Sequence, residues 1–452
     1  MNQITLDITN SLKSRTNKEG LEKKMMYKTS LKLEQYNKAL WKNPYGFMEL
    51  PKNRFQFETI KKLANRSKRK KIKNLVILGI GGSSLGTQTI FEALLHPFHN
   101  YSDGIRKGLP RYFILDNIDP HTINRIVDIV RKEIEHTLLV VISKSGETPE
   151  TISQFMIFKK LMEKSKGFRE RIILITDQKK GILKQISEKE GYDTLNVPEG
   201  VGGRFSVLTP VGLFPSAVMG IDIDEIARGA LDMSNHIRKA RYTNNMAIVL
   251  ASILYLMDKS GRNIHVIMPY CERLSGFADW FRQLEAESLG KNSFGPTPMK
   301  SMGVTDQHSQ LQLYIDGPKD KCIMLLYSAR EKRPIPKTFP YIDSLDYLAK
   351  KDLNELFHAE FTGTSLSLTE AGTPNFSILL DDINAYNLGA LFFLYEVAIT
   401  YLGHLYKINP FDQPAVELGK IYTKAIMGKA GLEKQKRAAD RILSAPKTVI
   451  MF

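Results

Sequence analysis

The densest chemistry in this sequence lies in the segment SKSGETPET, residues 143–151, which follows an apolar run. It supplies four hydroxyl groups and one ammonium group, from Ser143, Lys144, Ser145, Thr148 and Thr151. Hydroxyls, backbone amides and the positive end of a helix are the groups that bind a phosphate dianion. Helix capping by Ser or Thr is the simpler interpretation, but a cap needs only one hydroxyl. The clustering therefore favours a phosphate site.

A glycine-rich turn, GIGGSSLG at residues 79–86, also follows an apolar run. Its glycines permit a tight turn and a close approach of the backbone to a ligand. A dinucleotide fingerprint would need Gly where Ser84 stands and an acid about 20 residues later, and a P-loop would need a following Lys. Taken alone, the turn fits a plain strand-to-helix connection as well as a ligand site.

The next candidate site residues are an arginine and two carboxylates. Arg204 stands beside two glycines in GGRFS, where it is either held against a developing negative oxygen or engaged in an exposed salt bridge. Glu285 and Glu287 lie two apart on a predicted helix, so they point in different directions and are not a paired acid and base. One of them could be buried and act alone as a base, and a solvated helix face is the alternative.

A histidine and a lysine complete the candidates. His308, in TDQH, follows a loop rich in glycine and proline and is either a structural residue or a proton carrier. Lys420 ends the segment NPFDQPAVELGK, in which Pro414 fits the first turn of a helix.

From residue 74 onward, short apolar runs alternate with stretches of helical length. The runs predict strands at residues 75–78, 112–115, 138–142, 172–175, 194–197, 264–269, 322–327 and 376–380. This alternation is typical of parallel sheets with helices on both faces, which bind ligands at the carboxyl ends of their strands. We expect an α/β fold with an N-terminal arm and basic linker (1–73), two similar domains (74–221 and 222–425) and a C-terminal tail (426–452).

Composition narrows the class of protein. Of 452 residues, 42% are apolar and 25% charged, the balance of a soluble globular protein. The most apolar window, residues 388–402, is too short to span a membrane and contains Glu396; the first residues lack a secretory signal. Two cysteines cannot form a disulfide framework or metal cluster. We expect a cytoplasmic protein.

Half of the net charge of +16 comes from residues 61–73, which hold eight Lys or Arg and no acid. A solvated helix face or linker is the first interpretation of such a run. A nucleic-acid patch and a positive field that attracts a phosphorylated substrate are the alternatives.

Together, six segments resemble glucose-6-phosphate isomerases of the bacterial type. They occur in that family's order between residues 79 and 420: GIGGSSLG, SKSGETPET, VGGRFSVLTPVG, EAESLGK, TDQHSQLQLY and NPFDQPAVELGK. The resemblance implies two sugar-isomerase (SIS) domains, each a mainly parallel sheet between helical layers, and a homodimer. It also implies interconversion of glucose 6-phosphate and fructose 6-phosphate through a cis-enediol, in glycolysis and gluconeogenesis, without metal or cofactor and without nucleic-acid or membrane partners.

The resemblance also assigns roles to residues. Glu287 would be the base, and Arg204 would stabilise the enediolate. His308, from the second subunit, and Lys420 would open the sugar ring, and Glu150 would orient the histidine. The phosphate would be held by Ser143, Lys144, Ser145, Thr148 and Thr151. The sugar would be lined by Gly82, Ser83, Gln283 and Gln413.

Two other functions also fit parts of the sequence. A related enzyme acting on an amino-sugar or arabinose phosphate would not account for the segments EAESLGK and FDQPAVELGK. A sugar-phosphate-sensing regulator that binds nucleic acid through residues 61–73 should carry a helix-turn-helix module, which the first 73 residues do not clearly show.

Overall fold

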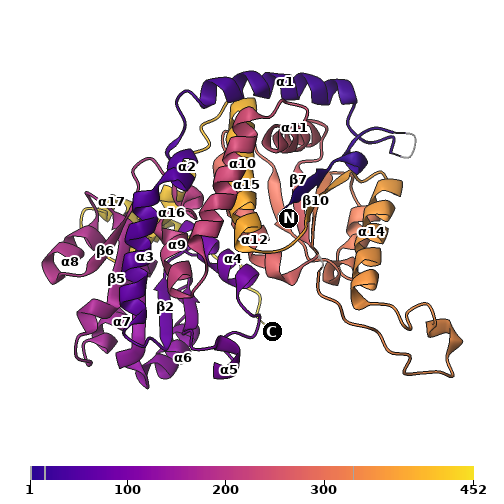
Figure 1. Ribbon diagram of the computed structural model, residues 1–452. Helices are drawn as coiled ribbons and strands as arrows, with labels where there is room; N and C mark the ends of the chain where they lie inside the picture. Colours follow the sequence, from indigo (N-terminus) through magenta and orange to yellow (C-terminus); the bar gives the residue numbers. More distant parts are fainter. Residues whose placement is uncertain (1–2, 15–16, 329, 452) are drawn as a thin grey trace. The chain divides into compact units, whose positions relative to one another are not determined.

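The computed structural model describes residues 3–14, 17–328 and 330–451. The chain forms two compact units, Met1–Pro410 and Phe411–Phe452. The first unit contains two five-stranded sheets (Figure 1). The second contains helices α16 (Glu417–Ile426) and α17 (Glu433–Leu443).

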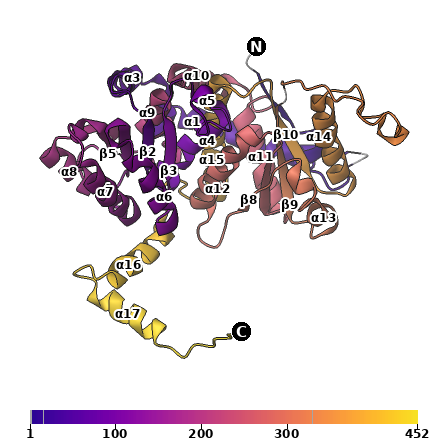
Figure 2. The ribbon, with the colours of Figure 1, turned by 90° about the horizontal axis from the view of Figure 1, so that it is seen from below.

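The first sheet is entirely parallel and has the order β3-β2-β4-β5-β6. Its strands are β2 (Asn74–Leu78), β3 (Arg111–Leu115), β4 (Thr137–Ile142), β5 (Ile172–Asp177) and β6 (Asp193–Val197). Strands β2 and β4 are buried along their whole length, because helices cover both faces. The covering helices are α3 (Arg54–Lys68), α4 (Leu85–Leu94), α6 (Pro120–Arg131), α7 (Pro149–Met162), α8 (Ile182–Glu190) and α9 (Pro210–Val218). Figure 2 shows α3 and α9 on one face and α6 and α7 on the other.

The second sheet has the order β1-β10-β9-β7-β8 and is parallel except for β1. Its strands are β1 (Ile4–Asp7), β7 (Ile264–Pro269), β8 (Thr297–Lys300), β9 (Lys321–Tyr327) and β10 (Asn375–Leu380). Helices α13 (Leu311–Asp316) and α14 (Leu353–Glu370) supply Tyr314, Phe361 and Leu368 to the core on one face. The predicted α/β architecture with parallel sheets between helices is confirmed.

Buried helices occupy the space between the two sheets (Figure 1). They are α10 (Ile223–Lys239), α12 (Ser275–Leu289) and α15 (Ala385–Tyr406), with α1 (Lys23–Leu40) and α11 (Met246–Lys259) alongside. Helices α10 and α15 cross closely, since a Cβ on Gly229 or Gly389 would lie within 2 Å of a carbonyl oxygen of the other helix. Helix α15 is long and apolar enough to cross a membrane, but 94% of its apolar window is buried within the protein, as in a core helix.

Two strands were missing from the sequence prediction. Strand β1 pairs with β10, so residues 4–7 belong to the second sheet and are not only part of an arm. Strand β8 contains Pro298 and lies at the sheet edge, where proline is tolerated. The domain boundaries expected at residues 73, 221 and 425 stay predictions.

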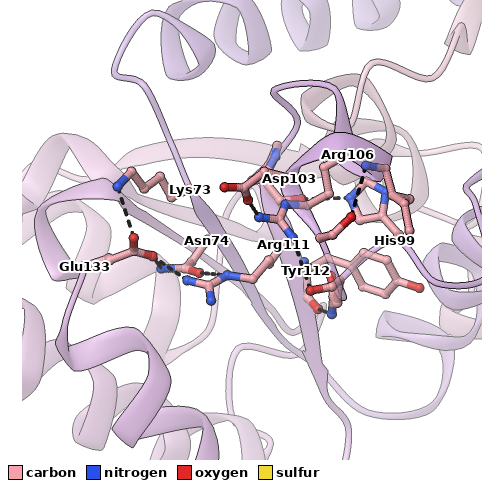
Figure 3. A network of polar contacts seen from close by, with 12 residues as sticks. Lys73, Asn74, His99, Asp103, Arg106, Arg111, Tyr112 and Glu133 are labelled. Atoms are coloured by element: carbon pink, nitrogen blue, oxygen red, sulfur yellow. Dashed lines mark hydrogen bonds and ion pairs between the residues drawn. The ribbon is translucent and has the colours of Figure 1, made fainter.

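The basic segment 61–73 lies on α3 and the turn after it. Its cations contact acids of other elements: Lys61 pairs with Asp224 at 3.0 Å, and Lys70 pairs with Glu170. Lys73 pairs with Glu133 at 3.0 Å, in a network at the amino ends of β2 and β3 (Figure 3). The interpretation of a solvated helix face is supported because six of the eight cations are exposed: Lys62, Arg66, Lys68, Arg69, Lys71 and Lys73.

Candidate active site

The glycine-rich turn and the hydroxyl-rich segment lie at the same edge of the first sheet. Strands β2 and β4 are parallel neighbours, with Leu78 opposite Val141. The chain leaves β2 into the 3-10 turn Gly81–Ser83 and leaves β4 into residues 143–148, which we call the hydroxyl loop. The expected placement of both motifs at strand carboxyl ends is confirmed, at the edge where open parallel sheets bind ligands.

The hydroxyls of this loop converge on one another. The oxygens Ser143 Oγ and Thr148 Oγ1 are 2.9 Å apart, and Ser145 Oγ lies 3.5 Å from each of them. Thr148 is the N-cap of α7 but makes no side-chain capping bond, so simple capping does not explain its hydroxyl. Thr151 and Glu150 follow in the first turn of α7, and Thr151 is buried. The loop presents hydroxyls at a helix N-terminus, as a phosphate dianion requires.

Two glycines of the first turn allow other segments to approach. Gly81 has φ +59°, and a Cβ there would lie 2.8 Å from Gln283 Nε2. A Cβ on Gly82 would lie 2.3 Å from the carbonyl oxygen of Gly203. The turn therefore brings helix α12 and the segment before Arg204 against the end of β2. Sequence reasoning considered a ligand here and did not foresee these protein contacts.

Arg204 is buried, with 1% of its side chain exposed, so the alternative of an exposed salt bridge is wrong. Its Nε donates to Ser288 Oγ at 2.7 Å, and a terminal nitrogen donates to Glu287 Oε2 at 3.2 Å. The other terminal nitrogen donates to the carbonyl oxygen of Pro410. A guanidinium held at three points keeps a fixed orientation, which suits it to position or stabilise negative charge.

The two carboxylates of α12 point in different directions, as their spacing predicted. Glu287 is partly exposed, and its two oxygens accept from Gln283 Nε2 at 2.8 Å and from Arg204. Glu285 is fully buried and accepts from His265 Nδ1, on β7, at 2.8 Å. The buried acid is thus engaged in the core, whereas Glu287 reaches the edge of the first sheet beside Arg204.

Sequence reasoning missed three participants. Of these, only Ser288 could have been found from the local sequence, because it adjoins Glu287 within EAESLGK. Pro410 acts through its carbonyl oxygen, and His265 acts through a contact between β7 and α12 within the second predicted domain. Neither leaves a signal in the local sequence.

The remaining predicted site residues are His308, Gln413 and Lys420. His308 is exposed, at the end of the 3-10 turn Thr305–Gln307, after β8. Gln413 and Lys420 belong to the second unit, where Lys420 Nζ pairs with Glu417 at 2.8 Å. Among the described residues, no hydrogen bond or ion pair joins His308 to Glu287. Their catalytic roles stay predictions.

No group of three or more His, Cys, Asp or Glu side chains that could hold a metal ion occurs in the described ranges.

Fold and site together define an α/β protein of the sugar-isomerase type, with a hydroxyl-rich loop and a carboxylate held by arginine at one edge of the first sheet. The family described as phosphoglucose isomerase matches residues 58–305 and 355–444. The chain belongs to this family.

Relatives and solved structures agree. The chain is 40% identical over 437 residues to a glucose-6-phosphate isomerase of Rubrobacter xylanophilus, covering 95% of this chain and 99% of that one. It is 38% identical to a glucose-6-phosphate isomerase of Methanocaldococcus jannaschii, covering 86% and 94%. The crystal structure of hypothetical protein TT0462 from Thermus thermophilus superposes with a TM-score of 0.83 at 32% identity, covering 94% and 100%. A glucose-6-phosphate isomerase structure from Chlamydia trachomatis, at 22% identity and a TM-score of 0.72 with 86% and 77% covered, shares the fold.

Proposed function

We propose that this protein is an aldose–ketose isomerase that interconverts glucose 6-phosphate and fructose 6-phosphate, a step of glycolysis and gluconeogenesis. One observation carries the proposal: Glu287 is held between Arg204 and Gln283 beside the edge that bears the hydroxyl loop. Membership of the family supports the same reaction.

The hydroxyl loop would hold the phosphate group. Ser143, Ser145 and Thr148 offer hydroxyls, and α7 adds the positive end of its backbone dipole. Anchoring this end of the sugar keeps the reacting carbons within reach of the base, so binding energy becomes positioning. Gly82 and Ser83 would line the sugar next to it.

Glu287 would move the proton. Conversion of an aldose to a ketose takes a proton from C2 and returns it to C1 through a cis-enediol, so one carboxylate on one face can perform both transfers. Both oxygens of Glu287 accept a hydrogen bond, which fixes the plane of the carboxylate. Arg204 lies at the same carboxylate with its position already set, and its charge would stabilise the enediolate without reorganisation.

Ring opening needs a proton donor at the ring oxygen and an acceptor at O1, for which we propose His308 and Lys420, with Gln413 lining the sugar and Glu150 orienting the histidine. His308 is exposed, which supports its contribution to the site of a second subunit in a homodimer. In this proposal the domains are 74–221 and 222–425, the enzyme acts in the cytoplasm, and no cofactor takes part.

The decisive assay is conversion of fructose 6-phosphate to glucose 6-phosphate by the purified protein, coupled to a dehydrogenase and run without added metal. In deuterated water, the product should carry deuterium at C2, because the proton passes through a solvent-accessible carboxylate. Conversion of arabinose 5-phosphate under the same conditions is the control for the rival substrate class. Absence of fructose 6-phosphate turnover, or turnover of arabinose 5-phosphate alone, would overturn the proposal.

A further inference from the structure

A cavity of about 490 Å³ adjoins the hydroxyl loop at the carboxyl ends of β5 and β6. Its wall includes Lys144 and Ser145 of the loop, the segment 177–180 after β5, and residues 197–200 after β6. This volume falls within the range of pockets that bind small molecules. The cavity lies beside β5 and β6, whereas Gln283, which holds Glu287, contacts the turn after β2.

The cavity wall carries three lysines and two acidic residues. Glu199 pairs with Lys179 at 3.0 Å, and Asp177 accepts the backbone N–H groups of residues 179 and 180. Among the described residues, neither Lys144 nor Lys180 has an acidic partner within ion-pair distance. Two ammonium groups therefore remain for an anion.

The two lysines also influence each other. Lys144 is partly buried, and burial lowers the pKa of its ammonium; Asp177 opposes this effect and Lys180 adds to it. Two like charges near one another are unfavourable, and an anion between them would relieve the repulsion.

The wall that carries Lys180 is fixed to the hydroxyl loop. Asp177 N donates to the carbonyl oxygen of Lys144, and Leu183 N donates to that of Gly146, both at 3.2 Å. Gly181 has φ +100°, and a Cβ there would lie 2.5 Å from the carbonyl oxygen of Ser145. These contacts fix the backbone that carries Lys144 and Lys180 relative to the hydroxyl loop, while the Lys180 side chain is exposed.

We propose that this cavity is a second phosphoryl subsite, which binds the second phosphoryl group of a ligand whose first occupies the hydroxyl loop. The inference rests on the proposed function, because that function places the first phosphoryl group. Substrates with one phosphate leave the subsite unused. Diphosphorylated anions use both sites and compete with the substrate.

Inorganic pyrophosphate is the probe for two linked phosphoryl groups, and orthophosphate is the probe for one. Binding is measured by calorimetry at low salt, which requires no turnover, and inhibition is measured against fructose 6-phosphate. In Lys180→Gln, we expect pyrophosphate to bind about fivefold more weakly. The affinity for orthophosphate and the KM for fructose 6-phosphate should each change less than about twofold. Lys189→Gln, an exposed lysine of α8 outside the cavity, is the matched control and should leave all three values unchanged.

A second variant is designed to strengthen pyrophosphate binding. Glu199→Gln removes the partner of Lys179 and should tighten pyrophosphate binding about threefold. The subsite is refuted if Lys180→Gln and Lys189→Gln bind pyrophosphate alike, or if orthophosphate binding falls as much as pyrophosphate binding. If the unsubstituted protein shows no isomerase activity but these binding differences are observed, the proposed function is overturned and the anion subsite is not.

Discussion

Replacing Glu287 by Gln separates catalysis from structure. The amide keeps the shape of the carboxylate but cannot take a proton at neutral pH, so turnover should fall by at least the 10²- to 10⁴-fold that a general base contributes. The proposed phosphate contacts lie on another element, α7 and the loop before it, and should persist. We therefore expect fructose 6-phosphate to bind within about threefold of the original affinity.

The cost to stability should be small. Gln283 Oε1 is buried and lacks a hydrogen-bond partner among the described side chains, so the Gln283 amide can rotate and accept from the new amide at position 287. Arg204 then donates to the remaining oxygen and keeps its bonds to Ser288 and Pro410. Only the charge-assisted part of one bond is lost, about 1 to 2 kcal/mol in the free energy of unfolding.

Glu285→Gln is the matched control, since it is the same substitution on the same helix. His265 Nδ1 can still donate to the Gln oxygen, so turnover should stay within about tenfold of the original. The assays are coupled turnover, calorimetric binding of fructose 6-phosphate and urea unfolding of each variant. Near-original turnover in Glu287→Gln, or a larger loss in Glu285→Gln, would show that the base has been assigned to the wrong residue.

Three further outcomes are expected. Ser143→Ala should raise the KM for fructose 6-phosphate about tenfold with a smaller effect on kcat, read from steady-state kinetics, because it removes one hydroxyl of the converging set. Neutralising the basic residues 68–71 together should leave kcat unchanged, and a large fall would show that this run reaches the site. Burial raises the pKa of Glu396 well above its ordinary 4.5, so the folded state keeps a proton that the unfolded state loses, and stability falls as pH rises above about 4.5. Glu396→Met should therefore stabilise the protein by about 1 to 3 kcal/mol, and its advantage in thermal unfolding should grow as the pH rises from about 5. An advantage that does not depend on pH would contradict this.

Much of the fold could be predicted because its signal is local. Strands β2, β4 and β5 are buried on both faces and therefore appear as continuous apolar runs. Strand β1 was missed because its pattern alternates and its partner β10 lies at the other end of the chain. Strand β8 was missed because it is short and contains a proline.

The sequence by itself determined the types of groups at the site and the strand ends that carry them. Periodicity and motif spacing are properties of neighbouring residues, so the hydroxyl loop after β4 and the divergent carboxylates of α12 could be inferred without coordinates. Only the tertiary structure decided that Glu285 faces His265 while Glu287 faces Arg204, and that Arg204 is buried. Those choices depend on contacts between different elements, which packing sets and local pattern does not encode: His265 and Glu285 are 20 residues apart, and Arg204 is more than 80 residues from its partners on α12.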